Sequence, residues 1–220
     1  MSADHAAATV LVETPLSISE ALRTATRPQH EHAETRSYIT RLMGGELSLA
    51  EYTRYLAQYA YVYAVLESRD EPGDPAFLRD PALRRSAAIR ADLAALGVTD
   101  LEAEHPQLAS TRAYVEHLRT VVAGPLPEYV AHHYTRYLGD LSGGLAIGAM
   151  IARHYGATPE QLNFFHFEGI DKPVVYKREY RASLDALDID DAEVERLLAE
   201  AKYAFELNAA LFEELGATAA

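Results

Sequence analysis

The segment Tyr134-Thr-Arg-Tyr-Leu-Gly-Asp-Leu-Ser-Gly-Gly-Leu-Ala-Ile-Gly148 carries the pattern from which the fold is inferred. Its apolar residues recur at helical spacing, but glycine occupies positions 139, 143, 144 and 148. Each glycine inside a helix costs roughly 1 kcal/mol relative to alanine, so the four together cost on the order of 4 kcal/mol. A domain is typically stable by only about 5–15 kcal/mol. This surface must therefore need exposed backbone in place of side chains, and we expect the helix to bend at the glycines.

Two explanations fit this glycine pattern. Gly139 and Gly143 are four residues apart and share one helical face, so a flat ligand could approach the backbone there. Alternatively, another helix packs closely on the glycines, as in GxxxG motifs. Arg136, Asp140 and Ser142 make the segment a poor membrane span. The residue pattern alone leaves both explanations open.

Composition narrows the class of protein. The chain has 220 residues, enough for one domain with a substantial core, and 49% of them are hydrophobic. It has no cysteine, which excludes disulfides, cysteine-ligated zinc, iron–sulfur clusters and thiolate-ligated haem. The net charge of −13 disfavours a nucleic-acid partner. No apolar run reaches about 18 residues, so we expect no membrane partner. The lack of cysteine favours a cytoplasmic location.

Helical periodicity continues on both sides of the glycine-rich segment, and no stretch alternates as a strand would. Residues 1–15, which lack a signal-peptide pattern, are expected to be a disordered leader before a single domain at 16–216. Tyr52, Tyr55, Tyr59 and Tyr63 recur at helical spacing, which is typical of core packing. Pro28 predicts a bend, or a helix start just before His30. The predicted helices run from Ser17–Ser19 to Gly44, and over Ser48–Arg69, Pro81–Leu96, Gln107–Val122, Pro125–Tyr155, Val175–Leu187 and Asp191–Leu215.

Four motifs together resemble the haem oxygenase family. The run Arg136–Gly144 resembles the family's distal-helix signature, and His30-Glu-His-Ala-Glu34 resembles its proximal motif. Phe164–Ile170 with Tyr176–Arg181 is similar to the propionate-binding region, and Phe205–Phe212 resembles the last helix. The resemblance implies an all-α, single-domain fold with haem sandwiched between a proximal and a distal helix.

On the proximal side, the resemblance implies that His30 is the axial ligand of the haem iron and that Glu34, one turn on, orients its imidazole. His32 is the competing ligand. Two helical residues turn it about 200° from His30, so only one of the two can face the haem. The register of the motif selects His30.

On the distal side, the resemblance implies that Gly139 and Gly143 contact the porphyrin and that Asp140 holds a water network that delivers protons. The alternative for Asp140 is a purely structural role, as a surface charge paired with Arg136 at i, i+4. The further positions that resemble the family's site are Tyr63, Arg136 and Asn208 in the network, Arg23, Tyr134, Lys177 and Arg181 at the propionates, and Gly144 and Phe205 as other haem contacts.

The implied reaction opens haem b at a meso carbon, the α carbon being expected, to biliverdin, Fe²⁺ and carbon monoxide through a ferric hydroperoxo form. It needs O₂ and electrons from NAD(P)H, delivered by a ferredoxin or a flavoprotein reductase, because the chain has no flavin or nicotinamide fingerprint. We expect a monomer. Leu145 replaces the glutamine that often follows the Gly-Gly pair, and the loop Glu67–Pro75 is short, which leaves the shape of the pocket open.

Other functions fit less well. A haem carrier or sensor would keep His30 but would not need Asp140 together with the distal glycines. A di-iron oxidase needs two Glu-x-x-His pairs, and only Glu102-Ala-Glu-His105 has that spacing. A hydrolase would need a nucleophile motif that Gly139–Gly143 does not match.

Overall fold

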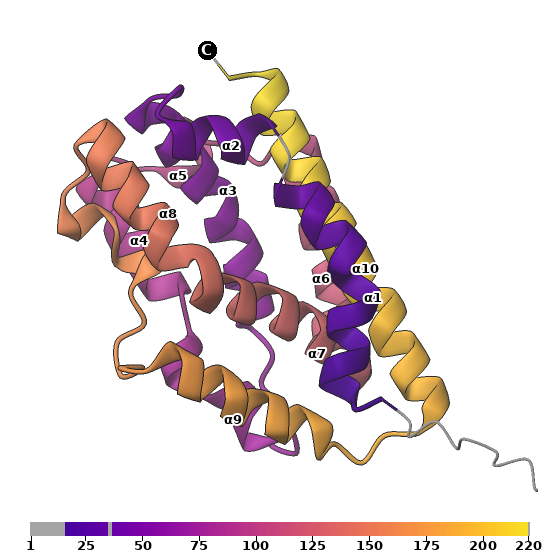
Figure 1. The fold of residues 1–220 in the computed structure, drawn as a ribbon. Helices are drawn as coiled ribbons and strands as arrows, with labels where there is room; N and C mark the ends of the chain where they lie inside the picture. Colours follow the sequence, from indigo (N-terminus) through magenta and orange to yellow (C-terminus); the bar gives the residue numbers. More distant parts are fainter. Residues whose placement is uncertain (1–15, 35–36, 220) are drawn as a thin grey trace, which may run out of the picture.

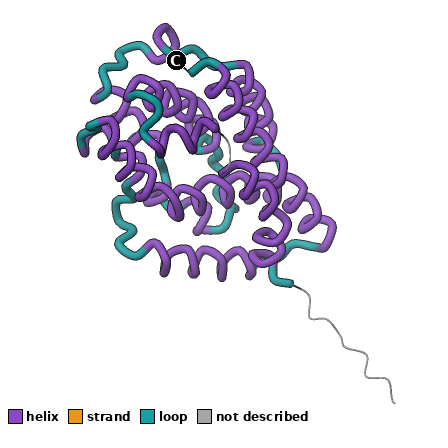
Figure 2. The backbone as a smooth tube through the Cα atoms, turned by 45° about the horizontal axis from the view of Figure 1, so that its top comes forward, coloured by secondary structure: helices purple, strands orange, loops and turns teal. Residues whose placement is uncertain are grey.

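The computed structural model describes residues 16–34 and 37–219, and the side chains of 16–28 and 38–219. All regular structure in these ranges is helical, which confirms the predicted all-α class (Figures 1 and 2). The α-helices are α1 (Ile18–Glu34), α2 (Ser37–Gly44), α3 (Leu49–Leu66), α4 (Ser86–Ala95), α5 (Leu101–Glu104), α6 (Ala109–Val122), α7 (Leu126–His133), α8 (Gly139–Tyr155), α9 (Pro173–Asp185) and α10 (Asp191–Ala217). The 3₁₀ turns are η1 (Ala76–Arg79), η2 (Pro81–Leu83), η4 (Pro159–Gln161) and η5 (Asn163–Phe165), and η3 (Tyr134–Leu138) is a π-helical turn.

Helix α10 is the longest element and organises one side of the molecule. It packs against α1, α6 and α7, and Figure 1 shows α1 and α10 running side by side. Helix α3 lies in the interior and packs on α4 and α6. Within the described ranges, no helix combines the length and the apolar character that a bilayer crossing requires.

The tyrosines of α3 form the centre of the core, as predicted. Tyr52, Tyr55, Tyr59 and Tyr63 are all buried. The ring of Tyr59 lies 5.9 Å from that of Phe164 and 6.4 Å from that of Phe212, so this helix joins segments distant in sequence. Two of these hydroxyls also enter polar networks, which the core-packing interpretation did not include.

Helix α9 is pinned to its neighbours by polar contacts. The Ser19 backbone N–H and hydroxyl both donate to the Asp185 carboxylate, at 2.7 and 3.0 Å, and join α1 to the end of α9. At the other end, the Tyr176 hydroxyl donates to Asp80 at 2.6 Å. Tyr180, in the middle, hydrogen-bonds Nδ1 of His133 at 2.8 Å. The spacing between α1, α7 and α9 is therefore set by hydrogen bonds as well as by apolar packing.

The predicted boundaries fail where local hydrogen bonding overrides periodicity. Helix α1 begins at Ile18 and runs through Pro28, so no helix starts just before His30. The segment predicted to continue to Gly44 forms a second helix, α2, and the segment 81–96 begins as a 3₁₀ turn because the Asp80 carboxylate caps it. The short helix α5 was not predicted. The predicted leader at 1–15 lies outside the described residues.

Candidate active site

The glycine-rich segment is one continuous helical rod that contains a single π turn. The π turn, η3, is entirely buried, and α8 begins directly after it at Gly139. A π turn holds one more residue than an α turn and is frequently found at functional sites. The segment thus changes its helical register immediately before the glycines.

The glycines of α8 divide between two faces. A Cβ placed on Gly139 would meet no atom within 4 Å, and one on Gly143 would meet only Ile147 Cδ1, at 3.7 Å. In contrast, a Cβ on Gly148 would lie 3.0 Å from the Phe165 ring, and one on Gly144 would lie 3.5 Å from it. Gly144 and Gly148 therefore serve close packing within the fold. Gly139 and Gly143 leave open a surface that no described side chain fills.

A polar network lies beside the open glycine face. The Tyr63 hydroxyl donates to Oδ2 of Asp140. Next to it, Oδ1 of Asn208 accepts hydrogen bonds from the Tyr59 hydroxyl and from Nη1 of Arg136, both at 2.9 Å. These five residues come from α3, η3, α8 and α10, so tertiary packing brings them together. The bland interpretation of Asp140, a surface ion pair with Arg136, does not match this geometry.

The electrostatics of Asp140 favour proton exchange. Burial raises the pKa of its carboxyl group, while Arg136 and the Tyr63 hydrogen bond oppose that shift without cancelling it. Burial and the Asp140 charge also raise the pKa of Tyr63 well above its usual value, so that phenol stays protonated and keeps donating. Among the described residues none hydrogen-bonds Oδ1 of Asp140. This oxygen is therefore available to a ligand or to solvent.

Cations gather beside the same segment, near Tyr134 and Ser142. Burial raises the pKa of Tyr134, and the nearby guanidinium groups of Arg181 and Arg23 oppose the shift. Arg23 is largely exposed, with a 3.8 Å contact to Glu20. Lys177, one turn before Arg181 on α9, donates from Nζ to the Ser142 hydroxyl at 2.8 Å. Residues from α1, η3 and α9 thus form one basic edge beside α8.

The remaining predicted contacts have other positions. His30 and Glu34 belong to α1, but their side chains, like that of His32, lie outside the described residues. Phe205 is a partly buried residue of α10, two turns before Phe212. Gly144 faces Phe165 and not the open surface.

Arg85 is a buried residue near Asp140 that the sequence did not single out. It donates to the carbonyl oxygens of His166, at 2.7 Å, and Leu83, at 3.0 Å, and it lies 3.9 Å from the Phe167 ring centre. Its charge also helps to oppose the raised pKa of Asp140. No periodic pattern marks Arg85, because its partners are backbone oxygens, of the neighbouring Leu83 and of the distant His166.

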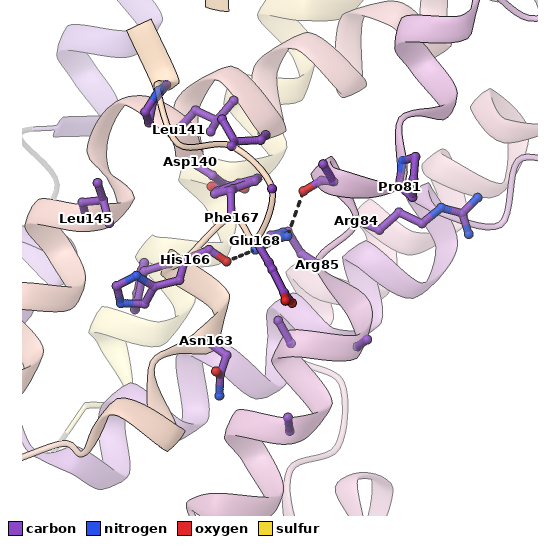
Figure 3. A pocket seen from close by; sticks show the side chains of 18 residues that line it. Pro81, Arg84, Arg85, Asp140, Leu141, Leu145, Asn163, His166, Phe167 and Glu168 are labelled. Atoms are coloured by element: carbon purple, nitrogen blue, oxygen red, sulfur yellow. Dashed lines mark hydrogen bonds between the residues drawn. The ribbon is translucent and has the colours of Figure 1, made fainter. Parts of the chain in front are cut away.

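A groove of about 1000 Å³ lies on the back of α8 (Figure 3). Leu141 and Leu145 form its α8 side, and His166 and Phe167 line it from the loop before α9. Leu141 is about 200° around the helix from Gly139. The groove is therefore distinct from the open glycine face, although both reach Asp140.

Comparison with known proteins identifies the family. The model of the family described as "Heme oxygenase" matches residues 16–214. "Heme oxygenase 1" of Gallus gallus is 38% identical over 206 residues, which cover 90% of this chain and 69% of that protein. The heme oxygenase of Leptospira interrogans superposes with a TM-score of 0.84 at 31% identity, covering 90% of this chain and 100% of that one. Heme oxygenase-1 of the cyanobacterium Synechocystis, solved in complex with heme, gives a TM-score of 0.84 at 29% identity, covering 92% and 93%. The chain belongs to the haem oxygenase family.

Proposed function

We propose that this haem oxygenase binds haem between α1 and α8 and opens it at the α-meso carbon to biliverdin, with release of iron and carbon monoxide. Bound haem would supply both the iron at which O₂ is reduced and the carbon that is oxidised. The observation that carries the proposal is the open face at Gly139 and Gly143, with an acid–phenol pair and several cations near it.

The described residues fit haem in three respects. The chain keeps glycine at two helical positions where the surrounding atoms would tolerate alanine, which preserves space for a flat ligand. Arg23, Lys177 and Arg181 provide cations for its two carboxylates. Nε of Arg136 is buried without a partner among the described residues, so this N–H could donate a hydrogen bond to a further acceptor at the network.

His30 is the proposed axial ligand, and Glu34 is proposed to orient it. Both assignments are supported by the match to the His-x-x-Ala-Glu motif. A neutral imidazole at this position would supply the nitrogen donor for haem iron.

Asp140 is the proposed proton-handling residue. The Tyr63 hydrogen bond fixes Oδ2, so protons would be held and released at Oδ1. A raised pKa keeps more of the protonated acid available near neutral pH, which suits a general acid. Asn208 holds Arg136 and Tyr59 together, and this arrangement keeps a positive charge beside the carboxylate. A haem carrier would have no use for that arrangement.

The electron source, the oxygen requirement, the monomeric state and the cytoplasmic location are also proposals. Electrons would come from NAD(P)H through a ferredoxin or a flavoprotein reductase, and the basic edge at Arg23, Lys177 and Arg181 gives an acidic donor a surface to approach. The cytoplasmic location is supported by the sequence, which has no cysteine.

The test is a single turnover of the chain loaded with one equivalent of haem, in air, with a ferredoxin and its reductase. Loss of the Soret band, a rising red absorbance and release of carbon monoxide are expected, and chromatography of the biliverdin isomers reports which meso carbon reacted. A Soret band that survives reduction in air would instead identify a carrier or sensor. A different biliverdin isomer would refute only the choice of the α carbon.

A further inference from the structure

Two histidines and a glutamate meet away from the open glycine face. His117 lies on α6, His132 on α7 and Glu200 on α10. Nε2 of His117 lies 2.5 Å from Oε1 of Glu200, and Nε2 of His132 lies 2.7 Å from the same oxygen. The potential ligand atoms of all three lie within 4.8 Å of one another. Three separate helices thus present one ligand atom each to a common point.

We propose that His117, His132 and Glu200 bind a divalent transition-metal ion. Two imidazoles and one carboxylate form a set that holds Zn²⁺ or Fe²⁺ in proteins and leaves further positions for water. Metal–ligand bonds of about 2.0–2.1 Å in a tetrahedral site separate the ligand atoms by about 3.3 Å. To reach this spacing, the two Nε2–Oε1 distances of 2.5 and 2.7 Å would each lengthen by less than about 1 Å.

The surroundings of the cluster match those of a metal site. The His132 side chain is fully buried, and the Tyr114 hydroxyl lies 3.5 Å from its Nδ1. This hydroxyl can accept from or donate to Nδ1, so it can support the tautomer in which Nε2 carries the lone pair. The side chains of His117 and Glu200 are 27% and 14% exposed. That edge of the cluster gives an ion a route from solvent.

Charge also favours a cation. Burial alone would raise the pKa of Glu200, but the hydrogen bonds from both histidines lower it overall, so the carboxylate is ionised. Burial lowers the pKa of His132, which keeps that imidazole neutral, as a ligand must be. Arg136 is the cation that faces His132 and acts against a bound ion. The Glu200 carboxylate therefore gives the cluster a negative charge.

Two sources of such an ion are compatible with the chemistry. One is the Fe²⁺ that haem opening liberates, which rests on the proposed function, and the other is Zn²⁺ from the surroundings. The cluster shares no side chain with the open glycine face or its basic edge, so binding of the ion can be tested without haem.

The experiment is calorimetric titration of the tag-free, haem-free chain with Zn²⁺, and with Fe²⁺ under anaerobic conditions, with Co²⁺ absorbance as a probe of geometry. We expect one ion per chain. His117→Ala and Glu200→Gln should each weaken binding at least about tenfold, because each removes one of three ligands. His154→Ala, at an exposed histidine of α8, is the matched control and should bind as the wild type does. Because such ligand sets generally bind Zn²⁺ more tightly than Fe²⁺, an affinity for Fe²⁺ equal to or above that for Zn²⁺ would favour the iron released by haem opening as the source.

His30→Ala tests the other candidate histidine and should also bind the ion normally, even if it fails to bind haem. Absence of saturable binding in the wild type would overturn the proposal. So would wild-type affinity in His117→Ala, whose partly exposed side chain can be removed with little risk to folding, or loss of binding in His30→Ala. Thermal melts of each variant show whether a loss reflects unfolding.

Discussion

Replacing Gly139 by alanine should raise the stability of the haem-free protein and weaken its binding of haem. The residue has ordinary helical angles, φ −62° and ψ −52°, and an added Cβ would meet no atom within 4 Å. The haem-free variant should therefore gain about 1 kcal/mol in the free energy of unfolding. For a domain of this size that gain corresponds to a melting temperature about 2–4 °C higher.

Haem binding should change in the opposite direction. The added methyl group would occupy the space that haem is proposed to use, and overpacking typically costs about 1–3 kcal/mol. The dissociation constant for haem should then rise roughly 5- to 150-fold. Soret titration measures this affinity, and urea denaturation of the haem-free protein measures the stability.

Gly148→Ala is the matched control on the same helix. Its Cβ would lie 3.0–3.2 Å from three carbon atoms of Phe165, so this variant should lose stability and leave haem affinity nearly unchanged. The reasoning would be refuted if Gly139→Ala destabilised the haem-free protein. It would also be refuted if that variant bound haem as tightly as the wild type.

Three other predictions concern single side chains. His30→Ala should abolish the normal ferric haem spectrum, whereas His32→Ala should leave it nearly intact; the reverse result would mean that the motif register is wrong. Asp140→Asn should bind haem normally but give less biliverdin per turnover, and an unchanged yield would remove Asp140 from the mechanism. Burial lowers the pKa of His133 to about 3, below its ordinary value of 6.5, so the folded protein should lose stability as the pH falls below 6.5. Urea denaturation should show a loss approaching about 1.4 kcal/mol per pH unit that is smaller in His133→Asn, and equal slopes in both proteins would contradict the assignment.

Much of the fold could be predicted from the sequence, because long amphipathic helices carry a strong periodic signal. The tyrosines of α3 show how far that signal reaches. Their spacing correctly placed them in the core, but it could not indicate that the hydroxyl of Tyr63 meets Asp140 or that that of Tyr59 meets Asn208. Those partners lie 77 and 149 residues away, and only tertiary packing brings them together.

The candidate site could likewise be predicted only in part. The energetic cost of the glycines indicated, without any knowledge of relatives, that a ligand or another segment approaches this helix backbone, but it could not decide between the two. The roles of Asp140 and His30 came from the family resemblance and are still proposals. Arg85 escaped notice because it sits between a 3₁₀ turn and α4 and binds carbonyl oxygens, which have no sequence signature. His117 also has no sequence signature, because His132 and Glu200, which it meets, lie on two other helices.

The π turn at Tyr134–Leu138 makes the residue count of this segment as important as its composition. One extra residue in a turn rotates every side chain after it by about 100° about the helix axis. With that advance, Tyr134 meets Arg181 while Gly139 faces open space. Substitutions within the turn change single contacts. A one-residue deletion there would restore an unbroken α-helix and rotate the glycines of α8 away from the basic edge.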